Sequence, residues 1–335
     1  MDNNIWSIDK LSYVLLGKNI NIVYRMEALF HARYYNNSDV ASILVKALQH
    51  ESVLLKHEIA YVLGQMSVTD VKNTLIDLCN DKSQHEMVRH EAAEAIHALG
   101  FTDEETEACL RQHLNDDSIP FRQTVELALE GLLLKRKSNS EKKIKPHVPR
   151  FYLMTKKKKK QDLVIATYNT KDPVESDILI QTENELKKHF NILKDETQRL
   201  WDRYKALFAL RNHDSKQAAL YLASCLDEKS SALLRHEISF ILGQMQIPET
   251  ALKLIERLQD KNEFSMCRHE AAISLGSLGA IDYTEIGCYW QPKIIAELKN
   301  FLNDEDPIIS ESCQVALFNI QNECNLQLLP NLVLL

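Results

Sequence analysis

Residues 54–66 read LLKHEIAYVLGQM, and residues 233–245 read LLRHEISFILGQM. Residues 87–100 read MVRHEAAEAIHALG, and residues 266–279 read MCRHEAAISLGSLG. Both pairs of segments are separated by 179 residues, and within each half of the chain two His-Glu dipeptides are 33 residues apart. Apolar residues recur in these segments at the three-to-four spacing of a helix face. A period of this length in helical sequence predicts one stacked pair of helices per repeat.

The duplication extends beyond these four segments. Residues 24–33 (YRMEALFHAR) match 203–211 (RYKALFALR), and 113–129 (HLNDDSIPFRQTVELAL) match 301–317 (FLNDEDPIISESCQVAL). The last match has a separation of 188 residues, which indicates a small insertion near Tyr283–Trp290. Gly and Pro number only eight each, too few for a β-rich fold with many tight turns. We therefore expect an all-α fold, a HEAT-type α-solenoid of two pseudo-symmetric halves with about four helical hairpins each.

The charge of the chain is unevenly distributed. The formal net charge is −7, yet the stretch from Lys135 to Lys160 contains twelve Lys or Arg and one acid, so the remainder carries −18. Lysine-rich sequence with few apolar residues is typical of a linker. We expect an N-terminal repeat half over residues 1–134, a flexible Lys-rich linker over 135–177 and a C-terminal repeat half over 178–335. An acidic body favours a cationic ligand over nucleic acid.

The sequence lacks the signals of several other protein classes. It contains no run of eighteen apolar residues, and its start, MDNNIWSIDK, lacks the pattern of a secretory signal. The nucleotide-binding patterns GxGxxG, GxxxxGKS and GxxxxGKT do not occur. The seven cysteines are odd in number and lack CxxC spacing, which predicts reduced thiols. We expect a cytoplasmic protein with no membrane partner.

The His-Glu dipeptides are more frequent than composition explains. About one is expected by chance, but six occur. Four are in register with the repeats, at 57–58, 90–91, 236–237 and 269–270, whereas His50-Glu51 and His85-Glu86 have no counterpart, and His85-Glu86 is assigned to a loop. Stacked repeats align equivalent positions in a row, so the two rows converge if the halves curve toward each other. Four carboxylates in one cleft repel one another unless cations lie between them, which predicts a metal centre.

The ligand types restrict the metal. Imidazole and carboxylate without cysteine favour iron or manganese over structural zinc. Each half can supply two His and one carboxylate, the ligand set of non-haem iron oxygenases, so two equivalent sets favour two metal ions. Consecutive helix residues point about 100° apart, so the four side chains of one half cannot easily reach a single ion. We expect one Glu per half to remain outside the ligand set.

These motifs resemble the deoxyhypusine hydroxylase family, HEAT-repeat di-iron monooxygenases with four His-Glu motifs. The resemblance covers nearly the whole chain and rests on KHEIAYVLGQM and RHEISFILGQM, on RHEAA twice, on RYKALFALRN (203–212) and on YNTKDP (168–173). The Lys-rich expansion at 135–165 departs from the family pattern. The resemblance implies that six residues bind two Fe(II) ions per chain: His57, His90 and Glu91 in one half, and His236, His269 and Glu270 in the other. It associates the two remaining motif carboxylates, Glu58 and Glu237, with substrate binding.

The same resemblance implies a reaction. The substrate is a deoxyhypusine side chain on eukaryotic translation initiation factor 5A, a lysine extended by an aminobutyl group. Its hydroxylation uses O2 as co-substrate and two electrons from an external reductant. Two alternatives stay open. A non-catalytic HEAT-repeat scaffold predicts no stoichiometric iron, and a chromophore-lyase-like HEAT protein does not require four His-Glu pairs in register.

Overall fold

The computed structural model describes residues 5–140, 170–281 and 289–329, and in these ranges the chain forms helices and no strand. The first range contains α1 (Ile8–Leu16), α2 (Ile22–Ala32), α3 (Ser38–Ala47), α4 (Val53–Gln65), α5 (Lys72–Asn80), α6 (Glu86–Leu99), α7 (Glu104–Gln112) and α8 (Ile119–Ser140). The other two contain α9 (Glu183–Lys194), α10 (Leu200–His213), α11 (Lys216–Ser224), α12 (Ala232–Met245), α13 (Ala251–Gln259), α14 (Ser265–Gly279), α15 (Trp290–Asn300) and α16 (Pro307–Cys324). Two short 3₁₀ segments are η1 (Cys225–Asp227) and η2 (Pro248–Thr250).

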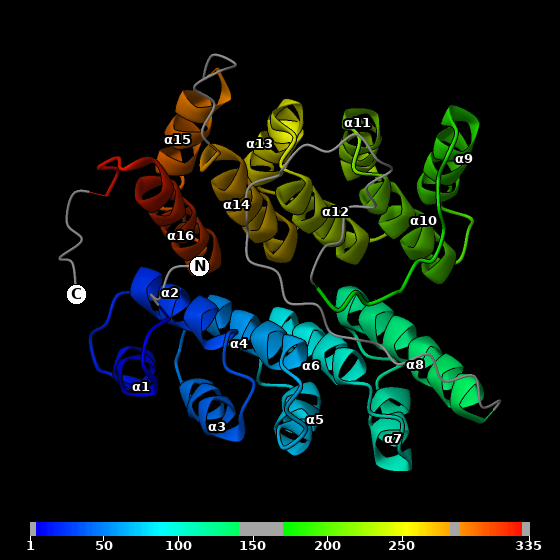
Figure 1. Cartoon of the computed structure of the whole chain (residues 1–335), viewed down its shortest axis with the longest axis horizontal. Coiled ribbons are helices and arrows are strands. Elements are labelled where there is room, and N and C mark those ends of the chain that lie inside the picture. Colours follow the sequence, from blue (N-terminus) through cyan, green and yellow to red (C-terminus); the bar gives the residue numbers. More distant parts are fainter. Residues whose placement is uncertain (1–4, 141–169, 282–288, 330–335) are drawn as a thin grey trace.

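The helices stack as hairpins in two rows, one row for each half of the chain (Figure 1). Even-numbered helices form the inner layer of each row and face the other half, while odd-numbered helices form the outer layer (Figure 1). Inner helices pack on their neighbours, α4 on α6 and α6 on α8 in one half, α12 on α14 and α14 on α16 in the other. This arrangement confirms the predicted HEAT-type solenoid with four hairpins per half.

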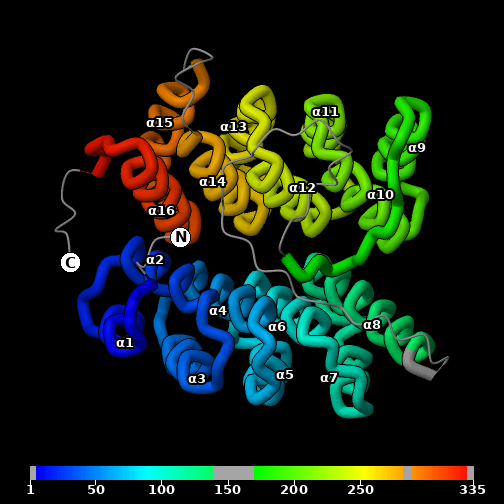
Figure 2. Tube along the Cα trace, viewed as in Figure 1, coloured from blue at the N-terminus to red at the C-terminus, as the bar shows by residue number. Residues whose placement is uncertain are grey.

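The last inner helix of each half packs against inner helices of the other half. Helix α16 contacts α2 and α4, and α8 contacts α10 and α12, at opposite ends of the molecule (Figure 2). Leu127 of α8 belongs to the hydrophobic core of the C-terminal half, and its sequence counterpart Val315 of α16 belongs to that of the N-terminal half. Burial of apolar side chains across the division therefore holds the inner layers of the two halves face to face.

Equivalent polar contacts also join the halves. Ser52 caps the N-terminus of α4, since its Oγ accepts a hydrogen bond from the Leu55 N–H at 3.0 Å, and the same hydroxyl donates to Glu311 Oε2 at 2.6 Å. Ser231 caps α12 in the same way and donates to Gln123 Oε1 at 2.7 Å. Because a cap residue determines where a helix begins, these contacts set the first turns of α4 and α12 relative to the opposite half.

The end of the predicted linker contacts both halves. The Lys171 backbone N–H donates to Gln65 Oε1 of α4 at 2.8 Å, and the Asp172 carboxylate accepts two hydrogen bonds from Arg211 of α10 at 2.7 and 2.5 Å. Helix α8 continues to Ser140. We propose that the N-terminal half ends at residue 134 and that the C-terminal half begins at residue 178. The lysine run 156–160 and most of the insertion near 283–290 lie outside the described residues.

The cysteines and the helix lengths can be compared with the predicted reduced thiols and the predicted lack of a membrane-spanning segment. In the described ranges, the buried cysteines are free thiols, as predicted: Cys79, Cys109, Cys225, Cys267 and Cys313. Cys288 lies outside the described residues. Among the helices described, none is both long enough and apolar enough to span a membrane.

Candidate metal centre

The four His-Glu pairs in register lie on the inner helices α4, α6, α12 and α14. All eight of their side chains are buried. The His85-Glu86 pair is separate from them. His85 is the N-cap of α6, where its Nδ1 accepts a hydrogen bond from the Met87 N–H at 3.2 Å, and Glu86 is the first residue of the helix. His85 therefore lies at the end of the preceding loop, as predicted, and caps the helix, whereas Glu86 belongs to the helix.

Small residues allow neighbouring inner helices to approach closely beside the His-Glu pairs. A Cβ added at Gly64 of α4 would lie 2.8 Å from the Cα of Ala95 on α6. A Cβ at the equivalent Gly243 of α12 would lie 3.0 Å from the Cβ of Ser274 on α14. Both separations are shorter than ordinary carbon contacts. The two glycines thus bring the His-Glu pairs of successive repeats next to each other in each half.

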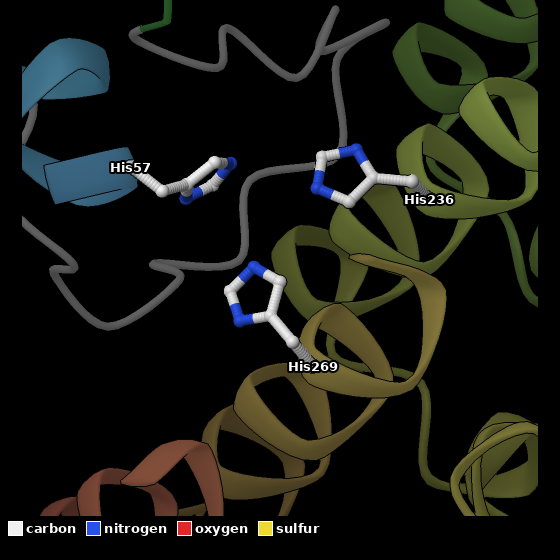
Figure 3. A group of neighbouring side chains, drawn as sticks. All are labelled: His57, His236 and His269. Carbon is white, nitrogen blue, oxygen red and sulfur yellow. The ribbon is translucent and has the colours of Figure 1, made fainter. Parts of the chain in front are cut away.

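The imidazole rings of the two halves converge. The ring centroids of His57 and His90 are 5.5 Å apart, and those of His236 and His269 are 6.0 Å apart. Across the halves, the His57 centroid lies 5.0 Å from that of His269 and 5.9 Å from that of His236. Figure 3 shows His57 on one side pointing toward His236 and His269 on the other. Four rings from four repeats thus form one cluster.

One carboxylate in each half lies near both imidazoles of that half. Glu91 Oε2 is 3.3 Å from His57 Nε2 and 3.6 Å from His90 Nε2. The equivalent Glu270 Oε2 is 3.7 and 3.4 Å from the Nε2 atoms of its two histidines. Neighbouring ligands of one octahedral ion with bonds of about 2.1 Å lie about 3 Å apart. Small side-chain adjustments would therefore place two imidazoles and one carboxylate around a metal ion in each half.

Two groups of three residues have ligand atoms that all lie within 4.8 Å of one another: His57 with His90 and Glu91, and His57 with His236 and His269. The first group has the same members as the ligand set expected for the N-terminal half. The second crosses between the halves and includes His57 where the expected set has Glu270. His57 is therefore within reach of both sets.

Six ring nitrogens of the cluster are buried without a hydrogen-bond partner among the described residues. They are Nε2 of His57, His90, His236 and His269, and Nδ1 of His57 and His236. Each such atom costs about 1–3 kcal/mol if nothing binds it. Burial lowers the pKa of His90, His236 and His269, to about 3 at His236, so these three rings are neutral. At His57 burial also acts to lower the pKa, but Glu58 and Glu91 outweigh it and raise the pKa to about 10. Neutral imidazole is the form that binds a metal, so the three neutral rings fit a metal cation directly, and His57 would give up its proton to one.

The two remaining motif carboxylates have different surroundings. Glu58 Oε1 lies 3.3 Å from His57 Nδ1. Burial raises the pKa of Glu237 to about 8, the charge of Asp172 adds to this increase, and the Arg211 guanidinium opposes it. A buried carboxylate whose charged form is disfavoured in this way gains from a neighbouring ammonium group. Glu58 therefore lies beside the imidazole cluster, and the environment of Glu237 favours a cationic ligand.

Two further residues contact the cluster, although the repeat motifs did not single them out. Thr124 Oγ1 of α8 lies 3.4 Å from His90 Nδ1, and Ser312 Oγ of α16 lies 3.2 Å from His269 Nδ1. The aligned segments 113–129 and 301–317 place Thr124 and Ser312 at the same position. The shared hydroxyl was therefore visible in the sequence, whereas its contact with an imidazole one repeat earlier was not.

Comparisons with known proteins agree with this picture. A family model described as HEAT repeats matches residues 18–97 and 40–130. The deoxyhypusine hydroxylase of Candida albicans is 34% identical over 322 residues, covering 93% of this chain and 91% of that protein. The human protein of that name is 31% identical over 316 residues, covering 94% and 92%. The solved structure of human deoxyhypusine hydroxylase in complex with glycerol has a TM-score of 0.78 at 31% identity, covering 94% of this chain and 96% of that one.

Proposed function

Since the chain belongs to the deoxyhypusine hydroxylase family, we propose that it hydroxylates the deoxyhypusine side chain of eukaryotic translation initiation factor 5A, which forms hypusine. Membership of the family makes the chain an enzyme, a monooxygenase. The metal, the co-substrate and the protein substrate are the parts that we propose here. The observation that carries them is the buried cluster of four imidazoles with unpartnered nitrogens next to four carboxylates.

Six residues would hold two ferrous ions: His57, His90 and Glu91, and His236, His269 and Glu270. Mixed imidazole and carboxylate ligands suit iron. The ions supply the activation of O2, and two electrons come from an external reductant. The contribution of the protein is to hold the ligands in place, to align the substrate carbon and to exclude bulk water from a site whose side chains are buried.

Glu58 and Glu237 would bind the substrate. Deoxyhypusine has two amine positions, and an ammonium group forms strong charge-assisted hydrogen bonds with a carboxylate. The pKa of Glu237, raised to about 8 by burial and by Asp172, favours a role in which an incoming cation stabilises the charged carboxylate. Because one such carboxylate stands in each half, they can hold the aminobutyl arm at two points and so fix which carbon faces the metals.

The charge of the chain supports a basic protein partner. Outside residues 135–160 the net charge is −18, and an acidic surface attracts a basic loop over several ångströms. This attraction weakens as salt screens it, so the reaction should slow at high ionic strength. We propose the cytoplasm as the compartment and neither nucleic acid nor a membrane as a partner.

The test begins with the purified protein, reconstituted with Fe(II) under anaerobic conditions. We expect about two irons per chain, as in other two-metal sites. Addition of O2, a reductant and deoxyhypusine-containing factor 5A should then raise the mass of that factor by one oxygen atom. A Glu58→Ala variant should keep its iron and show an increased KM. A wild-type chain that binds no iron under these conditions would instead support the non-catalytic scaffold.

A further inference from the structure

Two hydroxyl groups contact the imidazole cluster from equivalent positions on the last inner helix of each half. Thr124 lies on α8 and Ser312 on α16, and both side chains are buried. Thr124 Oγ1 is 3.4 Å from Nδ1 of His90, and Ser312 Oγ is 3.2 Å from Nδ1 of His269. Each hydroxyl thus reaches an imidazole on the preceding inner helix.

Each hydroxyl has a second partner, and this partner determines the direction of the first hydrogen bond. Thr124 Oγ1 lies 3.1 Å from the backbone oxygen of Pro120, and Ser312 Oγ lies 2.6 Å from that of Ile308. A carbonyl oxygen only accepts, and a hydroxyl has a single proton to donate. When that proton goes to the carbonyl, the hydroxyl can only accept from the ring. On this basis we assign the proton of each ring to Nδ1.

This assignment leaves the lone pair of each ring on Nε2. In both rings that atom is buried and has no hydrogen-bond partner among the described residues. Nε2 of His90 lies 3.6 Å from Glu91 Oε2, and Nε2 of His269 lies 3.4 Å from Glu270 Oε2. The lone pairs are thus next to the carboxylates that would share a metal ion with them. A hydrogen bond on the other ring nitrogen is how proteins orient an imidazole ligand.

We propose that Thr124 and Ser312 are positioning residues of the metal centre, each of which holds one imidazole in the Nδ1-protonated form with Nε2 directed at the metal. The proposal rests on the metal ligation of the proposed function and extends it to residues outside the His-Glu pairs. The other two rings are not held by a hydroxyl: Nδ1 of His57 lies 3.3 Å from Glu58 Oε1, and Nδ1 of His236 has no hydrogen-bond partner in the described ranges. Each half therefore combines one ring oriented by a hydroxyl with one that is not.

Removal of the hydroxyls separates this role from a purely structural one. Thr124→Val and Ser312→Ala delete the oxygen with little change in volume, while Thr124→Ser and Ser312→Thr keep it. Two other buried hydroxyls provide matched controls. Ser239 Oγ donates to the Arg235 carbonyl at 2.9 Å, and Thr250 Oγ1 donates to the Ile247 carbonyl at 2.8 Å, but neither hydroxyl contacts an imidazole of the described residues. The controls are Ser239→Ala and Thr250→Val.

The measurement is an anaerobic equilibrium titration of each purified full-length variant with Fe(II) alone, together with the thermal unfolding of the metal-free protein. We expect Thr124→Val and Ser312→Ala each to weaken one of two binding steps by about 10–100-fold, the range for outer partners of a ligand. The hydroxyl-retaining variants and both controls should stay within about 2-fold of the wild type. Because the two halves are tested separately, one variant suffices if the other does not fold.

The outcomes distinguish this inference from the function on which it rests. Wild-type affinity in a folded Thr124→Val or Ser312→Ala protein overturns the positioning role. An equal loss of affinity in the Ser239→Ala and Thr250→Val controls also overturns it, because the effect would then come from general loosening of the helices. A wild-type chain that binds no Fe(II) contradicts the proposed function itself.

Discussion

Lys56 and Arg235 occupy equivalent positions, one residue before a proposed ligand histidine in each half, yet their contacts differ. Lys56 Nζ donates one hydrogen bond to Gln84 Oε1 at 3.0 Å. Arg235 donates two to Glu263, at 2.6 and 2.7 Å. Arg257 also contacts Glu263, whose side chain is almost fully buried. The first His-Glu helix is therefore tied to the next repeat by a neutral acceptor in one half and by a buried ion pair in the other.

The residue before the second His-Glu pair does not show this difference, because it is an arginine with equivalent contacts in both halves. Arg89 pairs with Asp116 at 2.7 Å, and Arg268 pairs with Asp304 at 2.6 Å. Each arginine also donates from Nε to a backbone carbonyl at the end of the preceding outer helix, at 3.1 and 3.0 Å. Few other side chains can both pair with a carboxylate and donate a hydrogen bond to a carbonyl at the end of a helix. The two halves thus differ in the contact of the residue before the first His-Glu pair, but they share the contacts of the arginine before the second pair.

The largest effect should come from the residues that are identical in both halves. We expect His90→Ala and His269→Ala each to remove one of two metal ions and to lower the hydroxylation rate more than about 100-fold, beyond the loss typical of outer partners. Metal analysis and the mass-based assay measure both quantities. His113→Ala provides a control, since this buried histidine contacts Asn80 on the outer side. Full iron content in either cluster variant would remove that ring from the ligand set.

The second prediction tests the pair that differs. Arg235→Ala leaves the buried Glu263 with Arg257 and the Phe264 N–H and should lower the free energy of unfolding by about 3 kcal/mol, as for a broken buried ion pair. Lys56→Ala removes a single hydrogen bond to Gln84 and should cost about 1 kcal/mol or less. Urea unfolding of both variants, at the same metal loading, measures the difference. Equal losses would mean that the two contacts are energetically alike despite their chemistry.

The repeat pattern made the fold and the clustering of the His-Glu pairs predictable. A 33-residue helical period permits few architectures, and stacked repeats align equivalent positions. The place of His57 near both ligand sets was not predictable, because it depends on how far the halves curve toward each other. That curvature follows from long-range burial of Leu127 and Val315 in the opposite core. The contacts of Thr124 and Ser312 also depend on packing between helices, which periodicity alone does not describe.

The ion pairs that both halves share should have a smaller effect on stability than Arg235→Ala. Hydrogen bonds from Arg89 lower the pKa of Asp116. At Asp304 burial acts to raise the pKa, but the hydrogen bonds from Arg268 and the Asp306 N–H, together with the Arg268 charge, outweigh it and the net shift is downward. A carboxylate with a lowered folded-state pKa stabilises the protein above its unfolded pKa of about 3.9, and this stability is lost as the pH falls through the folded value.

Asp116→Asn and Asp304→Asn should therefore each lower the free energy of unfolding by about 2 kcal/mol at pH 7, the value of a hydrogen bond to a charged group. The difference from the parent protein should shrink as the pH falls below about 4, because the parent carboxylates then become protonated as well. Urea midpoints at several pH values for the parent and both variants measure this dependence. Because Arg89 donates two hydrogen bonds to Asp116 and Arg268 donates one to Asp304, the two curves should have the same shape, with the larger loss at Asp116. A pH-independent loss in one half alone would show that its aspartate acts through packing and not through charge.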